Sequence, residues 1–192
     1  SDRGRTVRAH LMLNLGTIGF GFMKASFFAS DENRQSTVEA LHTALDMGVR
    51  LFDTADIYAP TWDAFGHNEL LAAEAMRTHP LGSQAIIATK AGITRKPGEV
   101  WGRNASLDYL LRAAEASAGR LGVSRISLWQ HHRLDPNMPF EQQLENLAGL
   151  RQRGIIENIG VSNYSAKQLR RALEVVGPIA SVQNQFSPIY RN

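Results

Sequence analysis

Residues that can hold or transfer protons stand where short apolar runs of the sequence end. Asp53 and Lys90 each follow such a run, His131 and His132 follow a third, and Tyr58 lies five residues after Asp53. A lysine beside a tyrosine favours the phenolate and would lower the tyrosine pKa, and an aspartate would hold that lysine charged. A histidine could orient a substrate oxygen. The set therefore predicts proton transfer to, or next to, a carbonyl group.

Each of these residues also has a purely structural interpretation. Asp53 could cap a turn, Lys90 could extend along the surface, and Tyr58 could pack within a loop. One of the two histidines could simply satisfy a hydrogen bond in the core. A metal site is not expected, because the sequence has no cysteine, no His-x-x-x-His pair and no carboxylate pair at ligand spacing.

The composition is that of a globular domain. Hydrophobic residues make up 43% and charged residues 20% of the 192 residues. The net charge is only +3 and the basic residues are scattered, which argues against nucleic acid as a partner. Apolar runs are too short to span a bilayer, and the N-terminus lacks the features of a signal peptide. We expect a cytoplasmic protein with no membrane partner; its oligomeric state stays open.

Strand-like runs and amphipathic segments alternate along the chain. This order predicts βαβ units and a parallel sheet. In the second helix Leu70, Leu71 and Ala75 are expected to face inward, and Ser165 with Gln168 should form a capping box at the start of the fifth. The predicted strands cover residues 11–20, 49–52, 85–89, 126–130, 155–161 and 179–182, and the predicted helices cover about 38–47, 67–78, 107–121, 139–153 and 165–176.

An α/β fold of this kind is either an open doubly wound sheet or a (β/α)8 TIM barrel. Gly16, Gly19 and Gly21 lack the G-x-G-x-x-G spacing of a dinucleotide-binding open sheet. Polar residues follow successive strands, and in a barrel those strand ends meet at one mouth, so we favour the barrel. The stretches 23–33, 59–66 and 92–104 are expected to be mouth loops. Their aromatic residues, Phe27, Phe28, Trp62, Phe65 and Trp101, suggest an apolar pocket.

Several motifs resemble those of the aldo-keto reductase superfamily, in the right order from about residue 15 to the end. The strongest are Phe-Asp-Thr-Ala-Asp-Ile-Tyr at 52–58 and Gly-Val-Ser-Asn at 160–163. The His-Arg-Leu-Asp-Pro run at 132–136 is similar to the branch of potassium-channel β-subunits and microbial ketone reductases. Further matching stretches are Leu-Gly-Thr at 15–17, Gly-His-Asn-Glu at 66–69, Ile-Ile-Ala-Thr-Lys at 86–90 and Gln-Asn-Gln-Phe-Ser-Pro at 183–188.

This resemblance implies NADPH-dependent reduction of a small-molecule carbonyl substrate. By motif position, Tyr58 would donate the proton, Lys90 and Asp53 would tune it, and His132 would orient the carbonyl. Alignment on Gln130 would select His131 instead, but the downstream motif has more matching residues and selects His132. The resemblance also implies a set of cofactor-binding residues for NADPH/NADP+: Gly16, Thr17, Asp53, Ser162, Asn163, Gln183 and Phe186.

Two alternatives to a carbonyl reductase remain. One is a cofactor-sensing or assembly subunit that keeps the site but turns over little. The other, a non-redox barrel such as an isomerase, would need phosphate-binding loops that the sequence does not show. A complete barrel takes roughly 250 residues, so residues 1–192 are expected to form a single barrel domain without its last two βα units. That would leave a sheet edge open after 179–182 and remove loops that bind cofactor phosphate.

Overall fold

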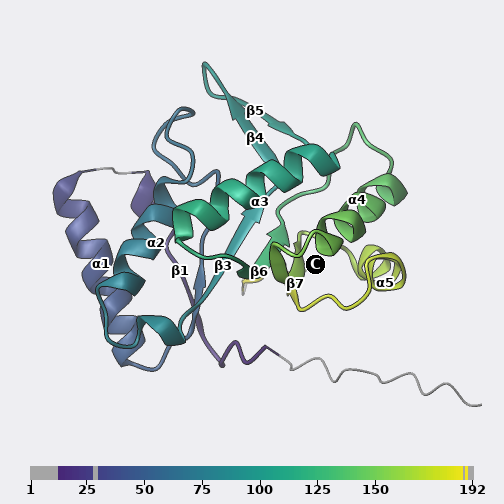
Figure 1. The fold of residues 1–192 in the computed structure, drawn as a ribbon. Helices are drawn as coiled ribbons and strands as arrows, with labels where there is room; N and C mark the ends of the chain where they lie inside the picture. Colours follow the sequence, from purple (N-terminus) through teal and green to yellow (C-terminus); the bar gives the residue numbers. More distant parts are fainter. Residues whose placement is uncertain (1–12, 28–29, 188, 190–192) are drawn as a thin grey trace, which may run out of the picture.

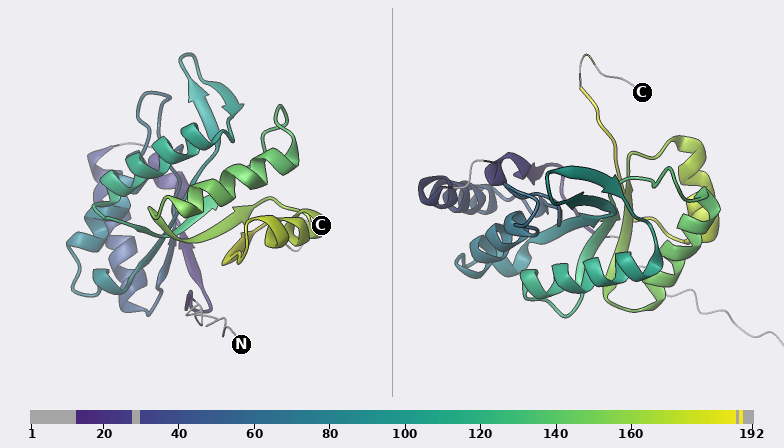
Figure 2. Two further views of the ribbon diagram at one scale, coloured as in Figure 1. Left: turned by 45° about the vertical axis from the view of Figure 1, so that its right-hand side comes forward. Right: turned by 90° about the horizontal axis from the view of Figure 1, so that it is seen from above.

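A computed structural model describes residues 13–27, 30–187 and 189, and its centre is a curled parallel sheet. The strand order is β1-β2-β3-β6-β7-β8. The helices lie in an arc along the outer side of this sheet (Figures 1 and 2). The sheet strands are β1 (Gly19–Gly21), β2 (Leu51–Asp53), β3 (Ile86–Ala91), β6 (Ile126–His131), β7 (Ile156–Ser162) and β8 (Ser181–Gln183), and the helices are α1 (Asp31–Asp46), α2 (His67–Arg77), α3 (Leu107–Leu121), α4 (Phe140–Gln152) and α5 (Ala166–Val175).

The predicted alternation of strands and helices is confirmed, and the barrel is confirmed in part. All five strand pairings of the sheet are parallel. Over the part of the chain that the structure describes, β1 and β8 are the two edges, so the sheet curls without closing. The first strand is shorter than predicted, since residues 13–18 precede it without regular structure and residues 11–12 lie outside the described part.

The register brings the carboxyl ends of the strands to one edge of the sheet. Gly21 is paired with Asp53, Ala91 with His131, and Ser162 with Gln183. Residues at and just after these positions therefore surround a common space. This is the edge at which parallel-barrel enzymes build their sites.

Two expected loops contain regular structure. The stretch 23–33 holds a 3-10 helix (Met23–Ser26) and the first turn of α1, which begins at Asp31 rather than near residue 38. Within the stretch 92–104, β4 (Ile93–Lys96) and β5 (Val100–Arg103) form an antiparallel hairpin that projects beyond the sheet edge (Figure 1). Gly98 and Glu99, both at positive φ, make the turn between the two strands. Pro97-Gly98 is a turn signal between two short β-prone segments, so the hairpin was readable from the sequence.

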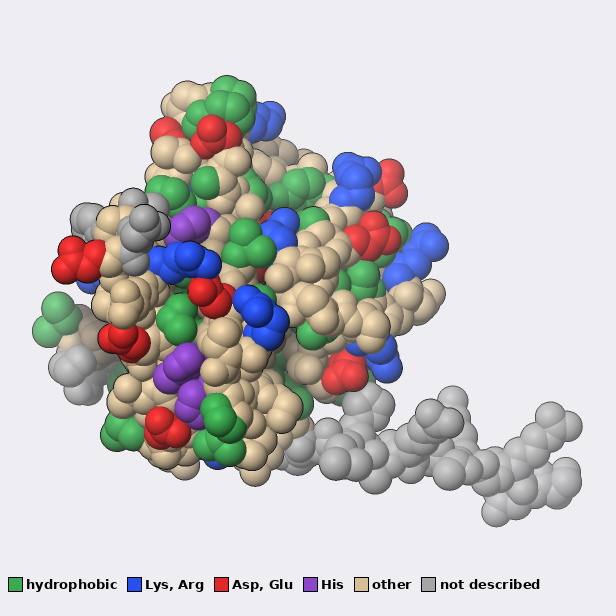
Figure 3. All heavy atoms as spheres, turned by 60° about the vertical axis from the view of Figure 1, so that its left-hand side comes forward, with side chains coloured by type: hydrophobic (Ala, Val, Ile, Leu, Met, Phe, Trp, Pro, Cys, Tyr) green, Lys and Arg blue, Asp and Glu red, His purple; other side chains and the backbone are tan. Residues whose placement is uncertain are grey.

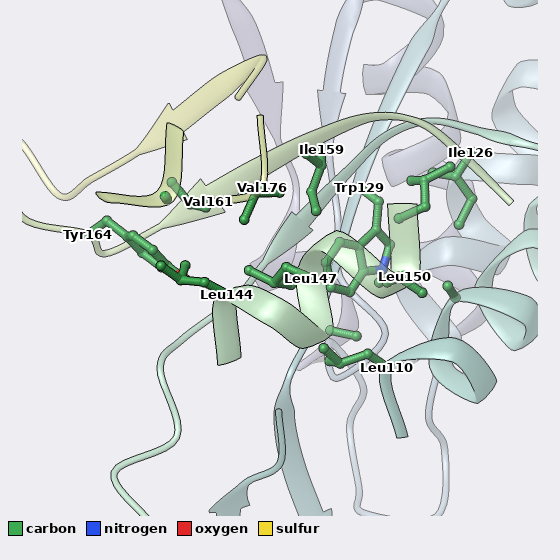
Figure 4. Close-up of a cluster of buried hydrophobic side chains, with 14 of the residues drawn as sticks. Leu110, Ile126, Trp129, Leu144, Leu147, Leu150, Ile159, Val161, Tyr164 and Val176 are labelled. Carbon is green, nitrogen blue, oxygen red and sulfur yellow. The ribbon is translucent and has the colours of Figure 1, made fainter. Parts of the chain in front are cut away.

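The largest buried cluster fills the layer between β3, β6 and β7 and helices α3 to α5 (Figure 4). Trp129 on β6 packs there with the leucines of α3 and α4. A second cluster, around Phe52, fills the space between β2 and the first two helices. The expectation that Leu70 faces inward is wrong: it is 54% exposed. Leu71 and Ala75, which were also expected to face inward, are buried as predicted.

Helix ends follow the signals in the sequence. The capping box of Ser165 and Gln168 is present at the start of α5, as predicted. Ser106 caps the start of α3, and Gly122 ends that helix in the left-handed region at φ 69°. These local signals fix where each helix begins and ends relative to the strand edge that carries the polar residues.

The face over α1 and α2 carries both signs of charge, interspersed rather than gathered (Figure 3). Arg34 and Glu74 form an ion pair there, with 2.8 Å between Nη2 and Oε2. Over the described residues, no helix combines the length and the apolar character needed to cross a membrane.

Candidate active site

The carboxyl edge of the sheet opens into a cavity of about 390 Å3. Five of its lining residues were predicted from the sequence as catalytic or cofactor-binding residues: Tyr58, His132, Ser162, Asn163 and Gln183. The others are apolar residues from the loop after β1, the loop after β2 and the β4–β5 hairpin, together with Arg133 and two residues that follow β8: Met23, Phe27, Ile57, Ile93, Trp101, Arg133, Asn184 and Gln185.

Lys90 is held beneath the cavity by three oxygen acceptors. Its Nζ lies 2.8 Å from each carboxylate oxygen of Asp53 and 2.7 Å from the Thr54 carbonyl oxygen. The lysine side chain is 1% exposed and the Asp53 side chain 19% exposed. Burial lowers the pKa of Lys90, and the Asp53 charge opposes that shift. The surface interpretation of Lys90 is therefore wrong, and the predicted pairing with Asp53 is present.

Tyr58 lies next to both Lys90 and His132. The Lys90 Nζ is 4.9 Å from the centre of the Tyr58 ring, and the His132 ring stands edge-on to it at 5.7 Å between centroids. The expected lowering of the tyrosine pKa is wrong. Burial raises the pKa of Tyr58, and the charges of Asp53 and Asp56 raise it further. The phenol is thus fully protonated at neutral pH, which is the state that a proton donor requires.

The two adjacent histidines point to different surroundings. His132 lines the cavity, whereas His131 is fully buried and its Nδ1 shares a hydrogen bond of 2.9 Å with the Tyr164 hydroxyl. Burial lowers the pKa of His132 to about 3, helped by the charges of Lys90 and Arg133. Over the described residues, the buried Nδ1 of His132 has no hydrogen-bond partner. A neutral imidazole at the cavity can orient an oxygen without itself changing charge.

The buried His131 should make stability depend on pH. Burial lowers its folded-state pKa to about 4, against about 6.5 for an unperturbed histidine. Between these values the unfolded chain binds more protons, so we expect the free energy of unfolding to fall as the pH drops from about 6.5 to 4, by up to about 1.4 kcal/mol per pH unit. Urea titrations of the wild type and of His131→Gln across this range test it, and equal pH slopes in both would contradict it.

Three polar side chains beside the cavity have the chemistry to bind a carboxamide. The Ser162 hydroxyl and the Asn163 amide are 2.8 Å apart, and the Gln183 amide nitrogen donates to Asp53 at 3.0 Å. Asn163 adopts a positive φ of 60°. Its backbone N–H donates to the Gln183 carbonyl at 3.0 Å, which ties the end of β7 to the end of β8. Hydroxyl and amide groups both donate and accept hydrogen bonds, as a carboxamide partner requires.

Four residues of the implied cofactor set do not line this cavity. Asp53 lies behind it, bonded to Lys90 and to Gln183. Gly16 and Thr17 precede β1 and lie towards its amino-terminal end, whereas the cavity opens at the carboxyl end. Met23, two residues after β1, lines the cavity from this strand. Phe186 is 80% exposed and lies beyond the cavity, next to the Gln185 that lines it.

The aromatic residues of the mouth loops divide into two groups. Phe27 and Trp101 line the cavity, as the suggestion of an apolar pocket requires. Trp62 is exposed, and Phe65 packs against a small buried cluster around Ile57. Phe28 lies outside the described residues.

A buried acidic group behind the site was not singled out from the sequence. Glu69, at the start of α2, accepts hydrogen bonds from the Thr89 hydroxyl and from Arg120 Nε, the latter at 2.6 Å. Burial and the charge of Glu69 raise the pKa of the neighbouring Asp56 well above its usual value. Both acids belong to motifs quoted above. The network therefore joins α2 and α3 to β3, the strand that carries Lys90.

Comparison of the sequence with models of known protein families identifies the class of parallel-sheet protein. The model of the aldo/keto reductase family matches residues 17–192. The chain belongs to this family. The resemblance drawn from the motifs is thereby confirmed, and it places the chain in a family of oxidoreductases that use nicotinamide cofactors.

Individual relatives agree with this assignment. An oxidoreductase of Schizosaccharomyces pombe is 30% identical over 177 residues, which are 91% of this chain and 55% of that protein. The aldo-keto reductase YhdN of Bacillus subtilis is 31% identical over 175 residues, 91% of this chain and 50% of that one. The chain thus spans about half the length of these curated relatives.

Solved structures confirm the fold. A glycerol dehydrogenase of Gluconobacter oxydans matches with a TM-score of 0.76 and 28% identity, covering 88% of this chain and 51% of that structure. An aldo-keto reductase of Bacillus halodurans in its holo form matches with a TM-score of 0.72 and 26% identity, covering 88% and 53%. The curled sheet with its outer helices is therefore of the TIM-barrel type of this aldo/keto reductase family.

Proposed function

We propose that this aldo/keto reductase family member reduces an aldehyde or ketone to an alcohol with NADPH, and that Tyr58 protonates the carbonyl oxygen. The observation that carries the proposal is the placement of the Tyr58 ring next to both a buried ammonium and a neutral imidazole. Lys90 Nζ is 4.9 Å from that ring and the His132 ring is 5.7 Å away.

Each of the three side chains has a separate part in the proposed proton transfer. Tyr58 is protonated and faces the cavity, so it is ready to give its proton. The charge of Lys90, fixed by Asp53 and the Thr54 carbonyl, would stabilise the phenolate that remains after donation. Neutral His132 would hold the carbonyl oxygen next to the phenol. Because the resting pKa of Tyr58 is raised, the phenol keeps its proton until the substrate oxygen becomes basic enough to accept it.

The polar side of the cavity carries groups that suit a nicotinamide. We propose that Ser162, Asn163 and Gln183 bind the nicotinamide carboxamide, because they combine donors and acceptors where β7 and β8 end. When bound, the nicotinamide supplies a hydride to the carbonyl carbon. The choice of NADPH over NADH rests on the resemblance to the family.

Steady-state kinetics on the full-length protein test the proposed activity. We expect NADPH oxidation that depends on an added aldehyde, with kcat within the ordinary enzyme range of about 1–10³ s⁻¹. Tight NADPH binding with turnover far below that range would instead favour the cofactor-sensing subunit. A protein that binds neither NADPH nor NADH would contradict both.

Asn163 offers a test of the cofactor site. We expect Asn163→Ala to weaken NADPH binding by about 3- to 10-fold, which corresponds to the loss of one amide hydrogen bond. Alanine at a positive φ adds backbone strain of about 1 kcal/mol, so Asn163→Gly is the matched variant that loses the amide without the strain. Calorimetric titrations of both variants should show a similar loss of affinity. Wild-type affinity in Asn163→Gly would remove the amide from the cofactor site.

A further inference from the structure

Two arginines flank this end of the cavity and have no part in the proposed proton transfer. Arg133 directly follows His132, and Arg103 ends β5 of the projecting hairpin. Both line a second hollow of about 550 Å3, which adjoins the first because the two share Trp101, Arg133 and Asn163. The hollow and the cavity thus form one continuous surface from Tyr58 and His132 to the two guanidinium groups.

The positive charge of this surface is not neutralised by an ion pair. Over the described part of the chain, neither Arg103 nor Arg133 forms a salt bridge; Arg103 Nη1 donates only to the Gly102 carbonyl, at 2.8 Å. Asp135 is the acid that acts on Arg103, but over the described residues it forms no ion pair with either arginine. The two guanidinium groups therefore have no bonded counter-charge.

The two guanidinium groups are close enough to affect each other and the catalytic residues. Burial lowers the pKa of Arg103, and the charge of Arg133 lowers it further. The charges of both arginines also lower the pKa of His132, and that of Arg133 opposes the rise in the pKa of Tyr58. A pair of like charges held at a cavity mouth is unfavourable by itself, and an anion between them would relieve the repulsion.

We propose that Arg103 and Arg133 form an anion-binding subsite that selects carbonyl substrates carrying a carboxylate or phosphate group. This proposal rests on the proposed function, since the subsite is useful only if a carbonyl group is held at Tyr58. The planar guanidinium matches both anions with two parallel hydrogen bonds. Trp101 lies between the two spaces and provides an apolar surface for the body of the substrate.

The hairpin is anchored well enough to hold this subsite in place. The Arg95 guanidinium lies over the Trp101 ring, 4.9 Å from its centre. Arg95 is itself bound by Glu99 and donates to the Ala59 carbonyl at 2.8 Å and the Pro60 carbonyl at 3.1 Å. The loop after β2 therefore fixes the Trp101 side of the subsite.

Matched substrates on the full-length protein test the subsite. The probes are 4-formylbenzoate and its neutral amide, 4-formylbenzamide, which differ in charge but hardly in shape. We expect the ratio of their kcat/KM values to favour the acid in the wild type. Arg133→Gln and Arg103→Gln should each lower that ratio by about 10- to 100-fold, the effect of losing a charge-assisted hydrogen bond. Replacing the carboxylate with a phosphate, in 4-formylphenyl phosphate, shows which anion is preferred.

The control is Arg112→Gln, which removes the same charge from an exposed position on α3 and should leave the ratio unchanged. An unchanged ratio in both subsite variants would overturn the proposal. An unchanged ratio with weaker NADPH binding would assign the arginines to cofactor phosphate instead. If neither aldehyde is reduced, the proposed function fails. Calorimetric binding of benzoate and of benzamide then still tests the subsite. Equal binding of the two ligands, or equal benzoate binding in wild type and variants, would refute the subsite.

Discussion

Tyr58→Phe is expected to reduce carbonyl turnover by about 10²- to 10⁴-fold, the usual contribution of a general acid. The substitution removes the proton to be donated and keeps the ring that stands edge-on to His132. NADPH affinity should therefore change little. Single-turnover reduction of an aldehyde, with a parallel NADPH titration, measures the two effects separately.

Tyr109→Phe is the matched control. Tyr109 is also a half-buried phenol whose pKa is raised by burial, but it lies on α3 and donates to the Ile93 carbonyl at 3.2 Å, outside the cavity. Its loss should leave turnover near the wild-type level. Similar rates for Tyr58→Phe and wild type would remove Tyr58 from the proton-transfer step.

Glu69→Ala is expected to lower the free energy of unfolding by about 3–5 kcal/mol, the range for breaking a buried ion pair. Glu69 is fully buried, and both of its carboxylate oxygens are used, one by Thr89 and one by Arg120. Removing it leaves the Arg120 guanidinium, 21% exposed, without its partner. Urea denaturation followed by circular dichroism gives the difference.

Glu74→Ala provides the comparison on the same helix. Glu74 pairs with Arg34 at the surface, and such exposed pairs contribute about 0–1 kcal/mol. The two alanine variants lose the same side chain from α2 and differ mainly in burial. Equal losses of stability would show that the Glu69 network does not contribute as a buried ion pair.

The strand and helix order was predictable because burial on both faces of a parallel sheet leaves a strong sequence pattern. Local sequence alone shows the apolar runs before Asp53 and Lys90. It also shows the helix face from Leu110 to Leu121. The open edge at β8 was expected as well, because six strands are too few to close an eight-stranded barrel. The exposure of Leu70 was missed because it lies one position from the buried Leu71.

The site residues were predictable where a polar or charged side chain directly follows an apolar strand. Asp53 and Lys90 were expected to pair, and the geometry brings them to 2.8 Å. The direction of the Tyr58 pKa shift was not predictable, because it depends mainly on burial, which the sequence does not show. Arg103 and Arg133 were also missed. Their 30-residue separation conceals that a hairpin and a strand end place them around one hollow.

The most direct test of the proposed activity follows a single atom. The full-length protein is mixed with an aldehyde and NADPH that carries deuterium at the transferable C4 position, and the alcohol is analysed by mass spectrometry. Carbonyl reduction by this site predicts one deuterium on the carbinol carbon of the product, formed in wild type and suppressed in Tyr58→Phe. An alcohol without deuterium, or a protein that binds the cofactor and leaves the aldehyde unchanged, would contradict the account.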